Sequence, residues 1–230
     1  MRSLMNRRPP IPASGNLLKA QDEELQKQLD EKGTVELTQV VASPIDTRLT
    51  LWQGDITRLN VDAIVNAANS QMLGCFVPLH GCIDNAIHTA AGIQLRLECD
   101  ELMKKLGHPE HTGTAKITKG YNLPSNYVIH TVGPIIYGSK VTHQEEAQLA
   151  GCYRSCLRLA DENKLISIAF CCISTGEYRF PNQQAAEIAV SVVREYFNLN
   201  QATGVKTVVF NVFKDIDYFI YGKLLQTDQG

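Results

Sequence analysis

The sequence predicts an α/β fold, a three-layer α/β/α sandwich around a mixed, mostly parallel central sheet. Short apolar segments typical of strands alternate along the chain with longer amphipathic segments typical of helices. The segment 167–173 is predicted as a continuous apolar strand, as expected where a strand is buried on both faces of the sheet. With 230 residues, 44% of them hydrophobic, the chain suits one domain with an extension.

Residues 1–45 are predicted to form an N-terminal extension to a domain that spans residues 46–230. The prolines and small residues of segment 1–15 favour a flexible leader. A helix is expected to follow, with Asn16 as its cap and Gly33 as its stop. Its apolar positions form a thin stripe, which indicates packing onto another part of the chain. They are Leu18, Leu25 and Leu29.

The remaining elements follow from periodicity and from the residues that begin and end them. A capping box from Thr142 to Glu145 begins one helix, Gly107 ends another, and Pro181 begins a third. Strands are predicted at 48–53, 63–65, 114–118, 127–132, 167–173 and 207–213. Helices are predicted at 84–106, 142–163, 181–197 and 216–225.

Composition narrows the class of partner. The net charge is −2 without a block of Lys or Arg, so the electrostatic footprint of a nucleic-acid binder is missing. No apolar run approaches the length of a membrane span, and segment 1–12 has no apolar core of a secretory signal. Its arginines leave organelle targeting open. The seven cysteines, including the pair Cys171 and Cys172, favour reduced thiols and a cytoplasmic protein.

One loop carries a candidate metal site. Cys75, His80 and Cys82 lie within eight positions of one another, in a segment that Pro78 and flanking glycines make a turn. Two thiolates and one imidazole are a good ligand set for Zn²⁺, and they leave a fourth tetrahedral position open, as in catalytic zinc sites. The same residues also fit a turn with two small buried cysteines and a histidine facing solvent.

Three loops are expected at the carboxyl ends of the strands, where α/β sheets bind ligands: 54–57, 66–84 and 174–181. In the first, Asp55 suits an exocyclic amine or ribose hydroxyl, although a turn carboxylate bonding its own backbone is the simpler interpretation. In the second, Asn69 is the amide expected to face a ligand, whereas Asn66 is expected to satisfy buried backbone.

The third loop, Ser174-Thr175-Gly176-Glu177, lies between a buried strand and a helix. Successive backbone amides in such a loop form an anion-binding nest that suits a diphosphate. Because Glu177 carries a negative charge, the backbone would have to bind the anion. Many ordinary strand–helix turns have the same composition.

Five short motifs follow one another along the chain: Gly54-Asp55-Ile56, Asn66-Ala67-Ala68-Asn69, the run Ile83 to Gly92, His130-Thr131-Val132-Gly133-Pro134 and Ser174-Thr175-Gly176. Taken together, these motifs resemble the macrodomain family. They occur in the order and spacing of that family over about residues 48–225. The triad of Cys75, His80 and Cys82 is similar to that of the zinc-containing microbial macrodomains, which are protein-ADP-ribose hydrolases, some associated with sirtuin-type ADP-ribosyltransferases.

The resemblance implies where ADP-ribose binds. Asp55 would hold the adenine amine, with the amide of Ile56 nearby. One loop would cradle the diphosphate and close over the distal ribose; it comprises Ser174, Thr175, Gly176, Glu177 and Tyr178. The sequence departs from the zinc-containing group at Tyr178-Arg179, where that group has Phe-Gly. Tyr178 can still stack on the ribose, whereas Arg179 replaces a flexible glycine.

The resemblance also implies the reactive residues. Asn69 would contact the distal ribose, and Cys82, Ile83 and Asp84 would line the same region, with Asp84 matching the catalytic aspartate of the hydrolytic macrodomains. We therefore expect a zinc-dependent hydrolase that removes mono-ADP-ribose from protein Asp or Glu side chains. The alternatives are an ADP-ribose-binding module without catalysis and a deacetylase acting on O-acetyl-ADP-ribose.

Overall fold

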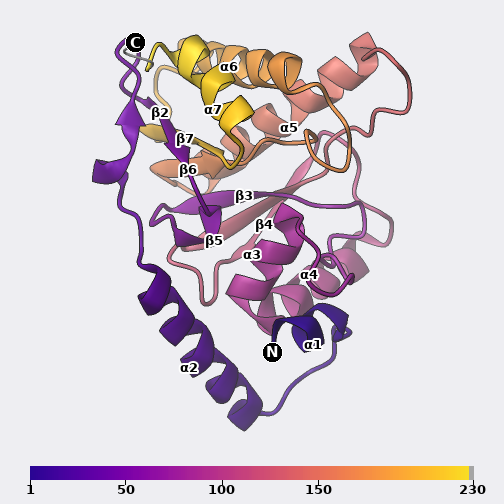
Figure 1. Ribbon diagram of the computed structural model, residues 1–230. Coiled ribbons are helices and arrows are strands. Elements are labelled where there is room, and N and C mark those ends of the chain that lie inside the picture. Colours follow the sequence, from indigo (N-terminus) through magenta and orange to yellow (C-terminus); the bar gives the residue numbers. More distant parts are fainter. Residues whose placement is uncertain (228–230) are drawn as a thin grey trace.

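A computed structural model describes residues 1–227 and confirms the three-layer sandwich. Helices α5, α6 and α7 cover one face of the sheet, and α1, α3 and α4 lie on the other (Figure 1). The helices are α1 (Arg2–Arg7), α2 (Gly15–Lys32), α3 (Ile83–Ala91), α4 (Ile93–Leu106), α5 (His143–Glu162), α6 (Asn182–Leu199) and α7 (Asp215–Leu225), with short 3-10 turns η1 (Leu37–Gln39) and η2 (Ile56–Arg58).

The sheet has seven strands in the order β1-β2-β7-β6-β3-β5-β4. The five central strands run parallel, and each edge strand pairs antiparallel with its neighbour. A parallel arrangement places the carboxyl ends of β2, β3, β5, β6 and β7 at one edge. The strands are β1 (Val41–Ala42), β2 (Leu49–Gln53), β3 (Ala63–Ala67), β4 (Ala115–Lys119), β5 (Tyr127–Thr131), β6 (Ser167–Phe170) and β7 (Thr207–Val212).

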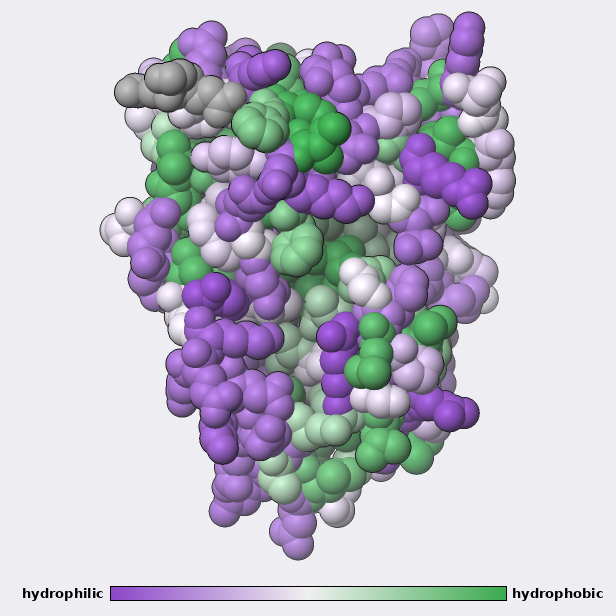
Figure 2. All heavy atoms as spheres, in the orientation of Figure 1, coloured by the Kyte–Doolittle hydropathy of each residue, from purple (hydrophilic) through white to green (hydrophobic). Residues whose placement is uncertain are grey.

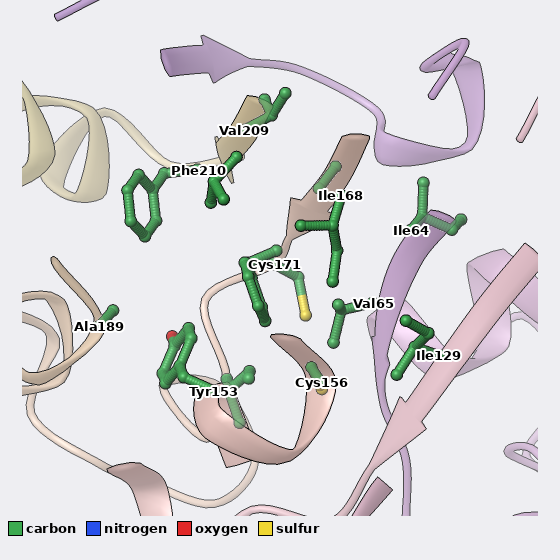
Figure 3. Close-up of a cluster of buried hydrophobic side chains, with 14 of the residues drawn as sticks. Ile64, Val65, Ile129, Tyr153, Cys156, Ile168, Cys171, Ala189, Val209 and Phe210 are labelled. Atoms are coloured by element: carbon green, nitrogen blue, oxygen red, sulfur yellow. The ribbon is translucent and has the colours of Figure 1, made fainter. Parts of the chain in front are cut away.

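One core cluster spans both faces of the sheet, with Ile87 and Leu95 of α3 and α4 on one side and Leu157 and Val193 of α5 and α6 on the other. Tyr153 of α5 and Ile168 of β6 are fully buried on the α5 side of the sheet (Figure 3), where the Tyr153 ring centroid lies 4.9 Å from that of Phe170. Every residue of β6 is buried, which agrees with the continuous apolar pattern of its sequence. The predicted strand 167–173 is nevertheless too long, because β6 ends at Phe170 and the chain then leaves the sheet.

The single helix predicted over residues 84–106 is two helices. Gly92 separates α3 from α4 and has φ +98°, a backbone conformation that favours glycine. A Cβ there would lie 2.7 Å from Gln21 Nε2 and 2.8 Å from Gln94 Oε1. The amphipathic pattern continues across the break, so periodicity alone did not reveal it.

The N-terminal extension is more ordered than predicted. The expectation of a flexible leader over 1–15 is wrong for α1, which packs beside α3. Ser14, not Asn16, caps α2 by accepting a hydrogen bond from the amide of Leu17. Met5, Leu25 and Ile93 form a small apolar cluster where α1 and α2 meet the start of α4.

Helix α2 is otherwise polar. Figure 2 shows hydrophilic side chains over the position of this helix, at the lower left. Short strand β1 pairs with β2, so residues 41–42 of the predicted extension belong to the sheet. Within the part of the chain that the structure describes, no helix combines the length and apolar character needed to cross a membrane.

Candidate functional site

The three loops that are predicted to bind a ligand lie at the same edge of the sheet. Strands β2, β3 and β6 are joined through parallel pairings, so the segments 54–57, 66–84 and 174–181 leave from their carboxyl ends. This is the edge at which open α/β sheets bind ligands. The fold therefore brings together segments that lie more than 100 positions apart in the sequence.

The loop with the metal-ligand pattern begins at Gly74. This residue has φ +78°, and a Cβ on it would lie 2.7 Å from Cγ of His88 in α3. Because His88 is buried, its ring has little room to move. A glycine is therefore required here both for the backbone conformation and for the close approach of the loop to α3.

Cys75, His80 and Cys82 come together as the sequence predicts. Their ligand atoms all lie within 4.8 Å of one another, and the three side chains are half-buried. Cys82 caps α3, and its Sγ accepts a hydrogen bond from the amide of Asn85 at 3.4 Å. His80 Nδ1 is buried without a hydrogen-bond partner among the described residues. The His80 side chain is 33% exposed, so it is turned neither fully to solvent nor fully inward.

Asp84 lies in the first turn of α3, two residues after Cys82. Its carboxylate is buried and accepts a hydrogen bond from Asn66 Nδ2 at 2.7 Å, and His88 Nε2 lies 3.5 Å away. Burial raises the pKa of Asp84 to about 6, opposed by the Asn66 hydrogen bond and by the charge of Arg96. The positive end of the helix dipole also favours a carboxylate in this turn.

Asn66 has a role that the sequence did not indicate. It was expected to satisfy buried backbone, but its amide nitrogen instead bonds Asp84 and lies 3.2 Å from Nδ1 of His130. Burial lowers the pKa of His130 to about 3, so its imidazole is neutral. With Nδ1 accepting from Asn66, Nε2 carries the proton and donates to Thr118 Oγ1 at 2.9 Å.

This buried polar group extends to a second cluster of possible metal ligands. His88, Cys99 and His130 place ligand atoms within 4.8 Å of one another, and all three residues are buried. Burial lowers the pKa of His88 well below its usual value, so this ring is neutral too. Both of these histidine side chains are buried.

The loop after β6 is a tight turn. Ser174 has φ +65°, and its buried hydroxyl lacks a hydrogen-bond partner in the described part of the chain. Its carbonyl accepts a hydrogen bond from the amide of Phe180 at 2.9 Å, while Thr175 Oγ1 donates to the carbonyl of Cys172 at 3.0 Å. Gly176 is exposed at the tip.

The loop after β6 faces the metal-ligand loop. Glu177 Oε1 lies 3.6 Å from His80 Nε2. Tyr178 is half-buried, and its pKa is raised by burial and by the nearby charge of Asp84. Arg179 adopts φ +60°, a conformation that glycine adopts more easily.

The loop 54–57 has the simpler of the two geometries expected for it, in which a turn carboxylate bonds its own backbone. Asp55 caps η2: its Oδ1 accepts from the amide of Thr57 at 3.1 Å and from Thr57 Oγ1 at 2.7 Å. Its Oδ2 lies 3.7 Å from Lys32 Nζ of α2. The next residue, Ile56, is buried.

The other predicted residues lie on the second loop. Asn69 is half-buried, and its Oδ1 accepts from the amide of Gln71 at 2.9 Å. Ile83 is half-buried and is the first residue of α3, between Cys82 and Asp84. Both therefore lie on the segment that joins β3 to α3.

Comparison with known proteins agrees with this architecture. The family model described as Macro domain matches residues 65–189. A protein from Treponema medium named Protein-ADP-ribose hydrolase is 52% identical over 229 residues, covering 98% of this chain and 86% of that protein. A protein of the same name from Staphylococcus aureus (strain MSSA476) is 48% identical over 227 residues, covering 99% and 84%.

A solved structure supports the same grouping. The Trypanosoma brucei macrodomain in complex with ADP-ribose has a TM-score of 0.75 to this chain and 34% sequence identity. The match covers 94% of this chain and 92% of that one. The fold, the match to the family model and the relatives matched over 84–86% of their length show that this chain belongs to the macrodomain family.

Proposed function

We propose that this protein is a zinc-dependent hydrolase that removes mono-ADP-ribose from ADP-ribosylated proteins, with the ADP-ribose ester-linked to Asp or Glu. The observation that carries the proposal is a buried carboxylate, Asp84, beside the cluster of Cys75, His80 and Cys82. It lies two residues after Cys82, and the pKa of that thiol is raised by burial and also by the nearby charge of Asp84. The names of the relatives support hydrolysis, and the ADP-ribose in the T. brucei structure supports the ligand.

The cluster fits a zinc ion. Two sulfur atoms and one imidazole nitrogen lie within 4.8 Å of one another, and they are the donor types that Zn²⁺ prefers. The buried, unpartnered Nδ1 of His80 also needs a partner, because a buried polar atom without one is costly. When bound, Zn²⁺ would supply Lewis-acid chemistry to an oxygen at the distal ribose.

The carboxylate of Asp84 would orient a water molecule at the distal ribose and accept its proton. Hydrolysis then consumes one water and gives free ADP-ribose and the free carboxylic acid of the target side chain. Asn66 holds Asp84 in place through its 2.7 Å hydrogen bond. A fixed carboxylate favours catalysis because the water is already aligned when the substrate binds.

The remaining loops would bind the rest of ADP-ribose. Asp55 and Ile56 would hold the adenine, and Asn69 with Ile83 would contact the distal ribose. The backbone of the loop after β6 would bind the diphosphate, since the exposed side chain of Glu177 would repel it. The members of that loop are Ser174, Thr175, Gly176, Glu177 and Tyr178. An enzyme of the sirtuin-type ADP-ribosyltransferase class would supply the modified protein.

The test is a release assay with defined Asp/Glu-, Ser- and Arg-linked mono-ADP-ribosyl substrates. The proposal predicts release from the Asp/Glu-linked substrate, with loss of release in the Cys82→Ala variant. Full turnover by a Cys82→Ala protein that had lost its zinc would contradict a catalytic metal. Tight ADP-ribose binding without release from any substrate would instead identify a binding module, and activity restricted to O-acetyl-ADP-ribose would identify a deacetylase.

A further inference from the structure

The loop that carries the candidate metal ligands has little packing of its own. Between Cys75 and His80, the side chains of Phe76, Val77 and Leu79 are 41%, 57% and 61% exposed. Leu79 also has φ +59°, which disfavours its conformation in an isolated loop. Contacts with other elements must therefore hold the backbone of this loop.

Helix α1 supplies two of these contacts. Asn6 is buried, and its Oδ1 accepts a hydrogen bond from the amide of Leu79 at 3.0 Å. Arg2 Nη2 donates to the carbonyl of His80 at 3.0 Å. Two side chains of one short helix thus bond the backbone at the metal-ligand candidate His80 and at the residue before it.

The same side chains tie the loop to α3. Arg2 Nη2 also donates to Asn85 Oδ1 at 2.9 Å, and Asn85 Nδ2 donates to the carbonyl of Val77 at 3.0 Å. Asn6 Nδ2 donates to Thr89 Oγ1 at 3.1 Å. Bonds from α1 and α3 therefore fix the loop around His80.

Helix α1 is itself held by Arg96 of α4. The Nη1 atom of Arg96 donates to the carbonyls of Met5 and Asn6 at 2.9 and 3.0 Å, and to that of Arg8 at 2.5 Å. Its Nε donates to the carbonyl of Leu73 at 2.6 Å, just before the loop. One buried guanidinium thus joins the end of α1, whose last carbonyls would otherwise be unsatisfied, to the start of the loop.

We propose that α1 is a positioning element for the metal site, with Arg2 and Asn6 as the residues that hold His80 at the distance its two cysteine partners require. This inference rests on the proposed zinc site. Groups that orient a metal ligand affect metal affinity without touching the metal. A segment outside the family-matched region 65–189 then contributes to the reactive end of the protein.

The test compares two variants with two matched controls and one conservative replacement, all expressed without an N-terminal tag. Asn6→Ala removes the bond to Leu79, whereas Thr89→Val removes the other bond of the same Asn6 side chain and leaves the loop contact. Arg2→Ala removes the bond to His80, Arg2→Lys keeps a positive donor, and Arg7→Ala truncates an exposed arginine on the same helix. Thermal unfolding of each variant establishes that the fold is retained.

The first readout is amide hydrogen exchange of Leu79 by NMR in the metal-free protein. In Asn6→Ala we expect the protection of this amide to fall about tenfold, because its bond partner is gone. Thr89→Val and Arg7→Ala should leave it unchanged. Unchanged protection of Leu79 in Asn6→Ala would overturn the positioning role, independently of any metal.

The second readout is zinc retention during titration with a competing chelator, together with the visible spectrum after Co²⁺ substitution. We expect Asn6→Ala to weaken zinc binding about tenfold and Arg2→Ala roughly threefold, since the Arg2 bond to the His80 carbonyl is exposed. Arg2→Lys should recover part of the loss. Altered Co²⁺ bands in Asn6→Ala would support a changed ligand geometry.

The outcomes separate this inference from the proposed function. Equal zinc retention and an unchanged Co²⁺ spectrum in Asn6→Ala and Arg2→Ala would overturn the positioning role alone. Absence of zinc from the unmodified protein would overturn the proposed zinc site, and the positioning role with it.

Discussion

Replacement of Gly74 by alanine tests the close approach on which the metal-ligand loop depends. Gly74 has φ +78°, which costs an L-residue about 1–2 kcal/mol. The new Cβ would also lie 2.7 Å from Cγ and 2.8 Å from Nδ1 of the buried His88 ring. Displacing a packed side chain costs about 1–3 kcal/mol more. The total expected loss in the free energy of unfolding is therefore about 2–5 kcal/mol.

Gly107 offers a matched control at the end of α4. Its φ is +76°, but a Cβ there would have no heavy atom within 4 Å. Gly107→Ala therefore carries the backbone strain without the clash. Urea denaturation of the metal-free proteins should show Gly74→Ala to be less stable than Gly107→Ala by about 1–3 kcal/mol. Equal losses in the two variants would refute the close contact with His88.

Three further predictions concern other parts of the site. Asp84→Asn should lower ADP-ribose release by about 10²–10⁴-fold while ADP-ribose binding persists, as measured by turnover and by calorimetric titration. Gly133→Ala should weaken ADP-ribose binding, because its Cβ would lie 2.0 Å from Ser174 Oγ and 2.9 Å from Ile173 Cγ2 and so displace the loop after β6. Because His130 has a folded-state pKa of about 3 against 6.5 when unfolded, it contributes stability above pH 6.5 that is lost as the pH falls. The loss is about 1.4 kcal/mol per pH unit, so His130→Gln should flatten the decline in stability between pH 6.5 and 5.5, measured by urea denaturation.

Contradictory outcomes for these predictions are equally specific. Unchanged release by Asp84→Asn would exclude this carboxylate from the reaction. Unchanged binding by Gly133→Ala would show that the loop after β6 does not need its observed position. If the free energy of unfolding of His130→Gln fell as steeply with pH as that of the unmodified protein, other groups would be responsible for the pH dependence.

Much of the fold could be predicted because it rests on local patterns. The alternation of apolar strands and amphipathic helices is a direct consequence of burial in a layered sheet, and the capping box at Thr142 correctly placed the start of α5. The break at Gly92 was missed because the apolar positions keep their helical spacing on both sides of it. Only the positive φ of Gly92 and the close approach of Gln21 of α2 and Gln94 of α4 reveal it.

Helix α1 could not be predicted because its stability comes from distant residues. Six residues are too few for a helix to be stable alone, and its last carbonyls are satisfied by Arg96, some ninety positions later. The prolines that suggested a flexible leader instead follow the helix.

The candidate site likewise has features that the sequence predicts and features that it does not. Cys75, His80 and Cys82 were predictable as a group because they share one turn. The link from Asn66 to Asp84 and His130 was missed because it joins β3, α3 and β5 through space. The sequence indicates that the segment carrying Asp84 follows β3 along the chain. It does not indicate which way the amide of Asn66 points.

The most direct test of the central claim is the release of ADP-ribose from a mono-ADP-ribosylated, Asp/Glu-linked protein before and after removal of the metal. The zinc-loaded protein should contain one zinc per chain and release ADP-ribose. The chelator-treated protein, verified as folded by circular dichroism, should be inactive and regain activity when Zn²⁺ is added back. Full release by folded protein shown to be free of metal would contradict the account.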